Sequence, residues 1–372
     1  MRYDAGMLRA LAALSLLAVP GCAASGGQGP TLERVRVAPG GKSFVLDPSG
    51  LPFVPWGFNY DHDEPGRLLE DYWEQEWPRV EEDFREMKAL GANLARIHLQ
   101  VGRFMEGPDR PDGKALARLW KLVDLADQVG LYLDLTGLGC YHKKDVPSWY
   151  DALDEEGRWG VQVRFWEAIA GRCAGRPAVF CYDLMNEPVV PGGDKKGTDW
   201  LGPPFAGKHF VQYVSLERKG RPRPDVAGAW AKRLVAAIRR HDPKTLVTVG
   251  LVDWSLDRPG LSSGFVPSAV APELDFLSVH LYPKGGKVDE ALETLRGFAV
   301  GKPVLIEETF TLGCGLEDFR SFVERSSETA CGWVGFYWGK TPEECRQGKS
   351  FQDALMAQWL DYFRAGPPPR RR

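Results

Sequence analysis

The feature that most constrains the fold is an alternation of short apolar runs with longer amphipathic runs, from about residue 50 to the C-terminus. Segments of strand length and helix length that alternate in this way favour parallel β/α architecture. Eight candidate strands, each followed by a helix or by room for one, match the count of a closed barrel. The candidates are residues 53–58, 93–99, 131–136, 179–185, 246–251, 276–281, 303–308 and 332–338. The sequence therefore predicts an α/β fold, a single-domain (β/α)8 TIM barrel.

Helix signals lie between the predicted strands. Val80, Phe84 and Met87 recur with the period of a helix, in a stretch that begins near Pro78 and ends before Gly91. Proline at the first helical position and glycine after the last one are typical of helix ends. The spacing predicts a helix that packs its apolar face against the sheet.

Three further segments complete the predicted domain, which we expect to span residues 43–366. Residues 226–238 follow Asp225, a potential helix cap. Residues 43–50 predict a short N-terminal β-hairpin that closes the bottom of the barrel. The longest irregular segment, residues 188–224, follows a strand end, where a barrel carries its active site. Loops of this length are commonly lids or binding loops, and this one could make an enzyme exo-acting by closing one end of its site.

The N-terminus has the pattern of an export signal. Arg2 and Arg9 precede the apolar run of residues 11–19, which is too short to span a bilayer as a mature helix. Residues 1–21 are therefore expected to be a cleaved signal peptide. The run ends at Cys22 in the letters VPGC, which resemble a bacterial lipobox and predict lipidation of Cys22, with ordinary signal cleavage as the alternative.

Residues 22–42 begin with a stretch rich in Gly and Ser and predict a flexible tether. Residues 367–372 predict a disordered tail. We expect an exported chain that is lipid-anchored to the cell envelope or secreted. It would meet the membrane only through its anchor, and we expect a monomer.

The charge balance and the cysteines exclude some classes of function. The formal net charge of -3 lacks the cationic excess that binding to a phosphate backbone needs, so nucleic acid is not an expected partner. Six cysteines follow Cys22 without CxxC spacing. His98, His142 and His280 are the candidate metal ligands, but no His-x-His ends a strand. We expect no metal and no cofactor. An even number of cysteines permits disulfides without showing them.

Two predicted strands end in glutamate. Glu187 stands in Asn186-Glu187-Pro188, where the proline is expected to hold Glu187 extended at the strand tip. Glu307 and Glu308 end the strand that begins at Pro303. Hydrolysis of a glycoside with retention needs two carboxyl groups about 5 to 5.5 Å apart, one protonated and one ionised. Two strands of one barrel that end in acid on the same face can supply this pair.

At these residues the sequence resembles family 5 of the glycoside hydrolases, the cellulase and β-mannanase group of the retaining (β/α)8 clan. Asn186-Glu187-Pro188 is similar to the acid/base motif on the fourth strand of that family. Residues 302–308 are similar to its nucleophile strand, and the spacing after Lys-Pro-Val selects Glu308 over Glu307. The resemblance implies that Glu187 is the acid/base, that Glu308 is the nucleophile, and that Asn186 contacts the substrate.

The resemblance extends in order along the chain, over roughly residues 43–365. It implies that Arg96 keeps the nucleophile ionised, that His280 contacts the acid/base and that Tyr282 contacts the nucleophile. It also implies that Trp338 floors the subsite of the reacting sugar and that Asn59 belongs to the first-strand Gly-x-Asn segment. Three tryptophans follow strand ends and are candidates to line sugar subsites, with packing as the alternative: Trp149, Trp200 and Trp254.

One departure leaves the substrate open. The third predicted strand ends at Thr136, where many members of the family carry histidine. The expected substrate is a β-linked oligo- or polysaccharide of the β-mannan or β-glucan type, cleaved by an endo-β-mannanase-like or cellulase-like enzyme through a covalent glycosyl-enzyme. Two alternatives remain: a transglycosylase, and a non-catalytic glycan-binding lipoprotein on a TIM-barrel scaffold.

Overall fold

A computed structural model describes residues 32–258 and 261–369. Eight parallel strands form a closed barrel in chain order, and the last strand pairs with the first. Every strand overlaps the range predicted for it, so the (β/α)8 prediction is confirmed. The strands are β4 Trp56–Asn59, β5 Leu94–Gln100, β8 Tyr132–Gly139, β9 Val179–Asn186, β12 Leu246–Val252, β13 Leu277–His280, β14 Val304–Thr309 and β15 Trp333–Gly335.

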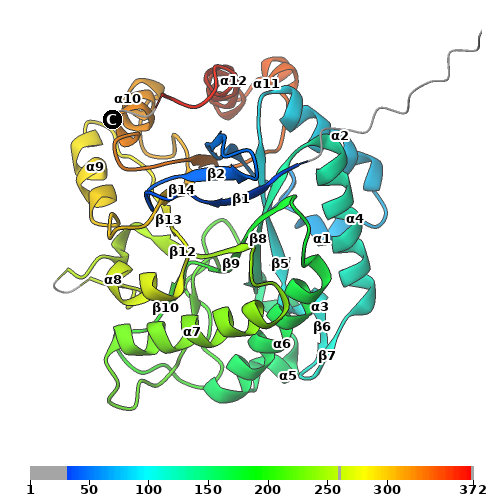
Figure 1. Ribbon diagram of the computed structural model, residues 1–372, viewed down its shortest axis with the longest axis vertical. Helices are drawn as coiled ribbons and strands as arrows, with labels where there is room; N and C mark the ends of the chain where they lie inside the picture. Colours follow the sequence, from blue (N-terminus) through cyan, green and yellow to red (C-terminus); the bar gives the residue numbers. More distant parts are fainter. Residues whose placement is uncertain (1–31, 259–260, 370–372) are drawn as a thin grey trace, which may run out of the picture.

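Helices surround the barrel as an outer ring (Figure 1). Their apolar faces pack against the strands, as their periodicity predicts. The longer helices are α2 Trp77–Ala89, α4 Gly113–Val129, α6 Glu155–Cys173, α7 Arg223–His241, α9 Val288–Arg296, α10 Leu316–Ser326 and α12 Phe351–Phe363. The short helices and outlying strands are α1 Leu69–Tyr72, α3 Val101–Phe104, α5 Ser148–Asp151, α8 Pro267–Val270, α11 Pro342–Gln347, β6 Met105–Gly107, β7 Arg110–Pro111, β10 Pro188–Val189 and β11 Gln212–Tyr213.

The predicted ends of α2 are confirmed, whereas the predicted cap of α7 is wrong. Helix α2 has Pro78 in its first turn and ends before Gly91, whose φ is +105°, as expected. Helix α7 begins at Arg223, so Asp225 lies inside the first turn and does not cap it. Pro224 explains the earlier start, because a proline in the first turn removes an N–H that has no helical partner there.

A small antiparallel sheet covers the N-terminal end of the barrel. Its strands are β1 Arg34–Val37, β2 Phe44–Asp47 and β3 Pro52–Phe53, and β1 and β2 cross the centre of the ring in Figure 1. Val35, Phe44 and Phe53 are buried in one cluster with the first residues of the barrel strands.

The hairpin predicted at 43–50 is therefore part of a larger sheet, and the prediction of a tether over 22–42 is wrong for β1. The domain begins before residue 43. The predicted signal peptide, Cys22, the tether up to residue 31 and residues 370–372 of the tail lie outside the described residues.

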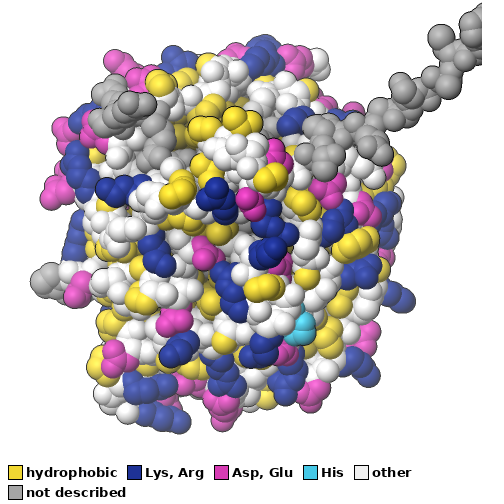
Figure 2. Space-filling model, viewed as in Figure 1, with side chains coloured by type: hydrophobic (Ala, Val, Ile, Leu, Met, Phe, Trp, Pro, Cys, Tyr) yellow, Lys and Arg dark blue, Asp and Glu magenta, His cyan; other side chains and the backbone are white. Residues whose placement is uncertain are grey.

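Positive and negative side chains are interspersed on the face that Figure 2 shows, as is usual for a solvated surface. Within the described ranges, no helix combines the length and apolar character needed to cross a bilayer. Cys140, Cys173, Cys181 and Cys345 are buried thiols, and Cys314 is a partly buried thiol. Burial raises the pKa of the Cys173 thiol to about 12.

Candidate active site

Glu187 and Glu308 lie together at the C-terminal end of the barrel. Glu187 directly follows β9, and Glu308 is the fifth residue of β14. One oxygen from each carboxylate and one ring nitrogen of His280 all lie within 4.8 Å of one another. Both glutamates line a cavity of about 420 Å³. The structure therefore brings together the two carboxyl groups that the sequence singled out, close enough for both to act on one glycosidic bond.

The backbone at Glu187 differs from the expectation. Its φ is +46°, in the left-handed region, so the residue is not extended. A non-glycine residue in this region is strained and persists only where its surroundings hold it. Here the Glu187 N–H donates to the carbonyl of Gly250 over 3.1 Å, and its carbonyl accepts from the N–H of Gln212. These bonds turn the chain sharply after β9.

Glu308 is held by two donors. A guanidinium nitrogen of Arg96 lies 2.6 Å from Glu308 Oε1, and the Tyr282 hydroxyl donates to Oε2 over 2.7 Å. Burial raises the pKa of Glu308, while the positive charges of His280 and Arg96 and the Tyr282 hydrogen bond oppose that rise. The carboxylate is therefore fixed in orientation and paired with positive charge.

Glu307 also points into the barrel, which strand alternation alone would not allow. Val279 pairs with Ile306 but His280 pairs with Glu308, so Glu307 is an extra residue in β14. Glu307 Oε2 lies 3.2 Å from His280 Nε2 and 3.5 Å from Arg96. Burial opposes its charge, yet Arg96 and His280 lower the pKa of Glu307 to about 2.

Glu307 is fully buried and does not line the cavity. Burial and the negative charge of Glu307 raise the pKa of Asp134 well above its ordinary value. Sequence reasoning did not predict this pair of acids below the site, because it treated Glu307 only as a rival to Glu308.

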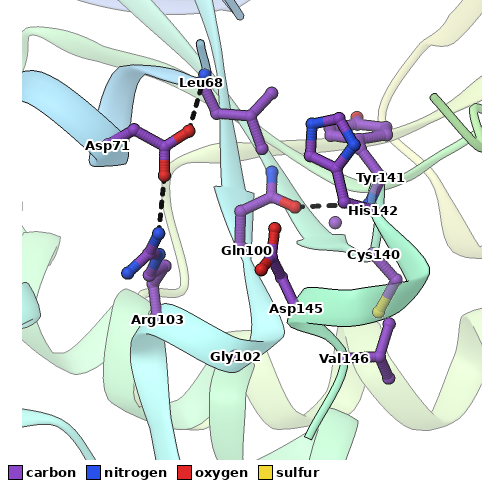
Figure 3. A pocket seen from close by; sticks show the side chains of 11 residues that line it. Leu68, Asp71, Gln100, Gly102, Arg103, Cys140, Tyr141, His142, Asp145 and Val146 are labelled. Atoms are coloured by element: carbon purple, nitrogen blue, oxygen red, sulfur yellow. Dashed lines mark hydrogen bonds and ion pairs between the residues drawn. The ribbon is translucent and has the colours of Figure 1, made fainter. Parts of the chain in front are cut away.

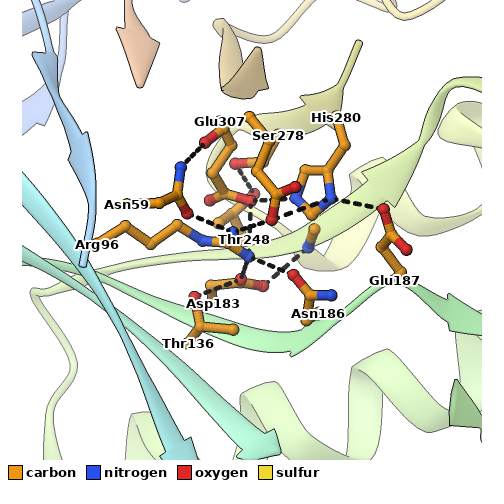
Figure 4. Close-up of polar contacts among 12 residues, drawn as sticks. Asn59, Arg96, Thr136, Asp183, Asn186, Glu187, Thr248, Ser278, His280 and Glu307 are labelled. Atoms are coloured by element: carbon orange, nitrogen blue, oxygen red, sulfur yellow. Dashed lines mark hydrogen bonds and ion pairs between the residues drawn. The ribbon is translucent and has the colours of Figure 1, made fainter. Parts of the chain in front are cut away.

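Arg96 is the centre of the polar network in Figure 4. It is fully buried and also binds Asp183 over 2.8 Å, Asn59 over 2.9 Å and Asn186 over 3.0 Å. Asn59 donates in turn to the carbonyl of Glu307, and Asn186 donates to the carbonyl of Phe210. Asn59 and Asn186 are buried with their amides engaged, so the structure places them as supports of Arg96 and not as groups that face a substrate.

His280 joins all three glutamates. Its Nδ1 lies 3.0 Å from Glu187 and 3.5 Å from Glu308, and its Nε2 faces Glu307. Burial opposes a charged ring, but Glu308 and the hydrogen bonds to Glu187 and Glu307 raise the pKa of His280 to about 10. This shift favours the charged ring, whose two nitrogens each face a carboxyl group, that of Glu187 on one side and that of Glu307 on the other.

Gly250 makes this arrangement possible. A Cβ at this position would lie 2.9 Å from His280 Nε2 and 3.2 Å from both Arg96 and Glu307. Any side chain would push apart the groups that hold the two glutamates. The glycine on β12 is thus part of the site although it carries no functional group.

The expectation for Trp338 is wrong. Its side chain is buried, its indole N–H donates to Asp83 over 3.1 Å, and it packs against Phe58. Strand β15 ends at Gly335, and it is Phe336 and Tyr337 that line the cavity. Phe336 therefore occupies the place that the sequence resemblance gave to Trp338.

The other tryptophans that were singled out do not line this cavity. Trp200 is buried, and the guanidinium of Arg158 lies 4.3 Å from its ring, so this side chain packs inside the protein. Trp149 lies beside Tyr150 and packs on the core. Trp254 is partly exposed after β12, away from the cavity lining.

The structure adds lining residues that sequence reasoning missed. His62, after β4, stacks on Tyr337 with ring centroids 4.0 Å apart. Six residues of the long loop also line the cavity: Pro203, Phe205, Ala206, Lys208, Phe210 and Val211. The length of that loop after a strand end was the only signal of this in the sequence.

Two groups of side chains have the spacing of metal ligands: Glu187, His280 and Glu308, and, more deeply, Asp134, Asp183 and Glu307. In the first group Glu308 contacts Arg96 and Glu187 contacts His280, and in the second group Asp183 and Glu307 contact Arg96. These positive charges oppose the binding of a cation.

His142 lies apart from His98 and His280. It lines a separate hollow of about 20 Å³ with Gln100 and Asp145 (Figure 3). A volume of this size holds about one water molecule. The three histidines considered in the sequence therefore do not form one site.

Several known proteins resemble this chain in sequence or in fold. The chain is 23% identical to Endoglucanase E-5 of Thermobifida fusca over 254 residues, 64% of this chain and 44% of that enzyme. An exo-β-1,4-mannosidase from Opitutaceae bacterium strain TAV5 superposes with a TM-score of 0.64 at 17% identity, covering 89% of this chain and 58% of that one. A β-1,4-mannanase from the sea hare Aplysia kurodai superposes with a TM-score of 0.58 at 19% identity, covering 82% of this chain and 92% of that one.

The chain thus spans about half the length of the first two of these proteins. The two structural likenesses, at this level of identity, support the fold. The family model for cellulase, glycosyl hydrolase family 5, matches residues 51–340, well over half of the chain. This protein belongs to glycosyl hydrolase family 5.

Proposed function

We propose that this protein is a retaining glycoside hydrolase that cleaves β-linked glycosides of the glucose or mannose type. The observation that carries the proposal is the approach of Glu187, His280 and Glu308 to within 4.8 Å at one end of the cavity. Membership of family 5 and the mannanase and endoglucanase relatives support the substrate class.

The proposed chemistry is a double displacement. An oxygen of Glu308 bonds to the anomeric carbon, while the bond to the leaving oxygen breaks and that oxygen takes the proton of Glu187. Glu187, now a carboxylate, then takes a proton from water, whose oxygen attacks the anomeric carbon and displaces Glu308. Arg96 and Tyr282 orient Glu308 for the first step, and His280 orients Glu187.

The stereochemical course tests this proposal. Purified protein is incubated with aryl β-glucosides and β-mannosides, and the first-formed sugar is followed by proton NMR. We expect the β-anomer to appear first, because two inversions at one carbon retain its configuration. Early α-anomer would refute the mechanism. Transfer products in place of free sugar would indicate a transglycosylase, and glycan binding without cleavage would indicate a non-catalytic protein.

The N-terminal sequence supports a second part of the proposal, export followed by anchoring through a lipid on Cys22. The apolar run of residues 11–19 and the VPGC letters carry it. In a bacterial host fed a clickable fatty acid, we expect label on the wild-type chain and none on Cys22→Ala. Equal labelling of both chains would contradict lipidation at Cys22.

A further inference from the structure

The cavity beside the two glutamates has walls that are mostly apolar. Nine of its sixteen lining residues carry apolar side chains, and none of the thirteen tryptophans, all within the described ranges, is among them. Hydroxyl groups along an extended polysaccharide need polar partners, because a buried hydroxyl without a hydrogen bond is costly. The walls are therefore better matched to a hydrocarbon than to a row of sugars.

The apolar side chains differ in exposure. Phe310 is 7% exposed and lies near the floor, whereas Phe205 and Leu312 are 68% and 59% exposed and line the mouth. Large apolar groups exposed around a cavity mark a binding surface for an apolar partner. Of the seven polar lining residues, Glu187, Glu308 and Tyr282 belong to the group around the two glutamates, and the other four are His62, Lys208, Tyr337 and Gln352.

Phe205 belongs to a hydrogen-bonded hairpin and not to an irregular loop. Phe205 and Lys208 exchange two backbone hydrogen bonds, of 2.8 and 3.0 Å, around Ala206 and Gly207. Both central residues have positive φ, +48° and +80°, as in the tight turn of a β-hairpin. The hairpin tip therefore fixes the position of the phenyl ring at the mouth.

The loop that carries this hairpin is attached to the side of the site where Glu187, the proposed acid/base, lies. It is joined to Glu187 by the bond from the Gln212 N–H, and to the end of β8 by the bond from His209 N–H to the Tyr141 carbonyl. In the proposed mechanism, the oxygen that Glu187 protonates belongs to the leaving group. The leaving group therefore meets the wall that carries Phe205, Phe210 and Val211.

We propose that the substrate is a β-glycoside whose leaving group is an extended apolar chain, bound between Phe205 and the Phe310–Leu312 segment. This inference rests on the proposed function. It names the aglycone, which the proposed function leaves open.

The test uses methyl, butyl and octyl β-glucosides and β-mannosides, below their critical micelle concentrations, so that only chain length changes. Each methylene that is fully buried contributes roughly fourfold, so kcat/KM should rise on the order of 100-fold from methyl to octyl if three or four methylenes are buried. The same series as non-hydrolysable thioglycosides, measured by calorimetry, reports binding without turnover and should show the same trend in Kd.

The Phe205→Ser/Leu312→Ser variant should lower the octyl-to-methyl ratio at least tenfold. Leu51→Ser is the matched control, because Leu51 is 58% exposed but lies in the turn between β2 and β3 at the opposite end of the barrel. This control should keep the wild-type ratio.

A chain-length-independent kcat/KM, together with cleavage of manno- or cello-oligosaccharides, would overturn the inference and leave the proposed function standing. If no glycoside of any kind is cleaved but the thioglycoside Kd still falls with chain length, the proposed function fails and the apolar site stands. A Kd that does not vary with chain length overturns the inference in every case.

Discussion

The Glu308→Ala variant is expected to lose turnover by on the order of 10⁵-fold, because it removes the group that forms the covalent intermediate in the proposed mechanism. Azide is small enough to enter the space left by the carboxylate, and it should restore turnover with an activated aryl glycoside. The product should be the α-glycosyl azide, since azide attacks once, from the side that Glu308 occupied. Steady-state rates and NMR of the product measure both effects.

Glu307→Ala is the matched control for this experiment. Glu307 adjoins Glu308 in sequence and contacts the same Arg96, but it is fully buried and does not line the cavity. Its loss should disturb His280 and Arg96 without giving any glycosyl azide. If Glu307→Ala is the variant that azide rescues, the nucleophile has been assigned to the wrong glutamate.

The Arg96→Met variant is expected to lose both activity and about 3 to 5 kcal/mol of the free energy of unfolding. Removing one partner from a buried ion network leaves uncompensated charge in the interior. Here Glu308, Asp183 and Glu307 would remain without their shared cation. Denaturant unfolding at pH 7 measures the loss of stability, and kcat/KM the loss of orientation at Glu308.

Two further variants make this prediction specific. Arg96→Met combined with Glu307→Gln should recover part of the lost stability, because one of the stranded charges is removed, and the double-mutant cycle measures the coupling. Arg221→Met breaks a partly exposed bidentate pair with Glu155 and should cost under about 1 kcal/mol. An Arg96→Met protein as stable as the Arg221→Met protein would show that the network does not depend on its cation.

Much of the barrel could be predicted because its signals are local. Each strand is an apolar run bounded by helix or turn residues, so periodicity located all eight strands. The RVRV pattern of residues 34–37 is also a local strand signal, and it was missed because the Gly-rich stretch before it suggested a tether.

The details of the site depend on features that the sequence pattern does not carry. The extra residue in β14 turns both Glu307 and Glu308 inward, against simple alternation. The early end of β15 exposes Phe336 to the cavity and buries Trp338 against Asp83. The left-handed turn at Glu187 is set by partners on β12 and in the long loop. Each of these outcomes follows from contacts between segments far apart in the chain.

The small sheet below the barrel also determines where the preceding residues join the domain. Its first strand starts at Arg34, on the end of the cylinder farthest from Glu187 and Glu308. A chain that is attached to a surface through the residues before Arg34 is therefore held by its closed base. In that orientation the open mouth of the cavity points outward, away from the surface.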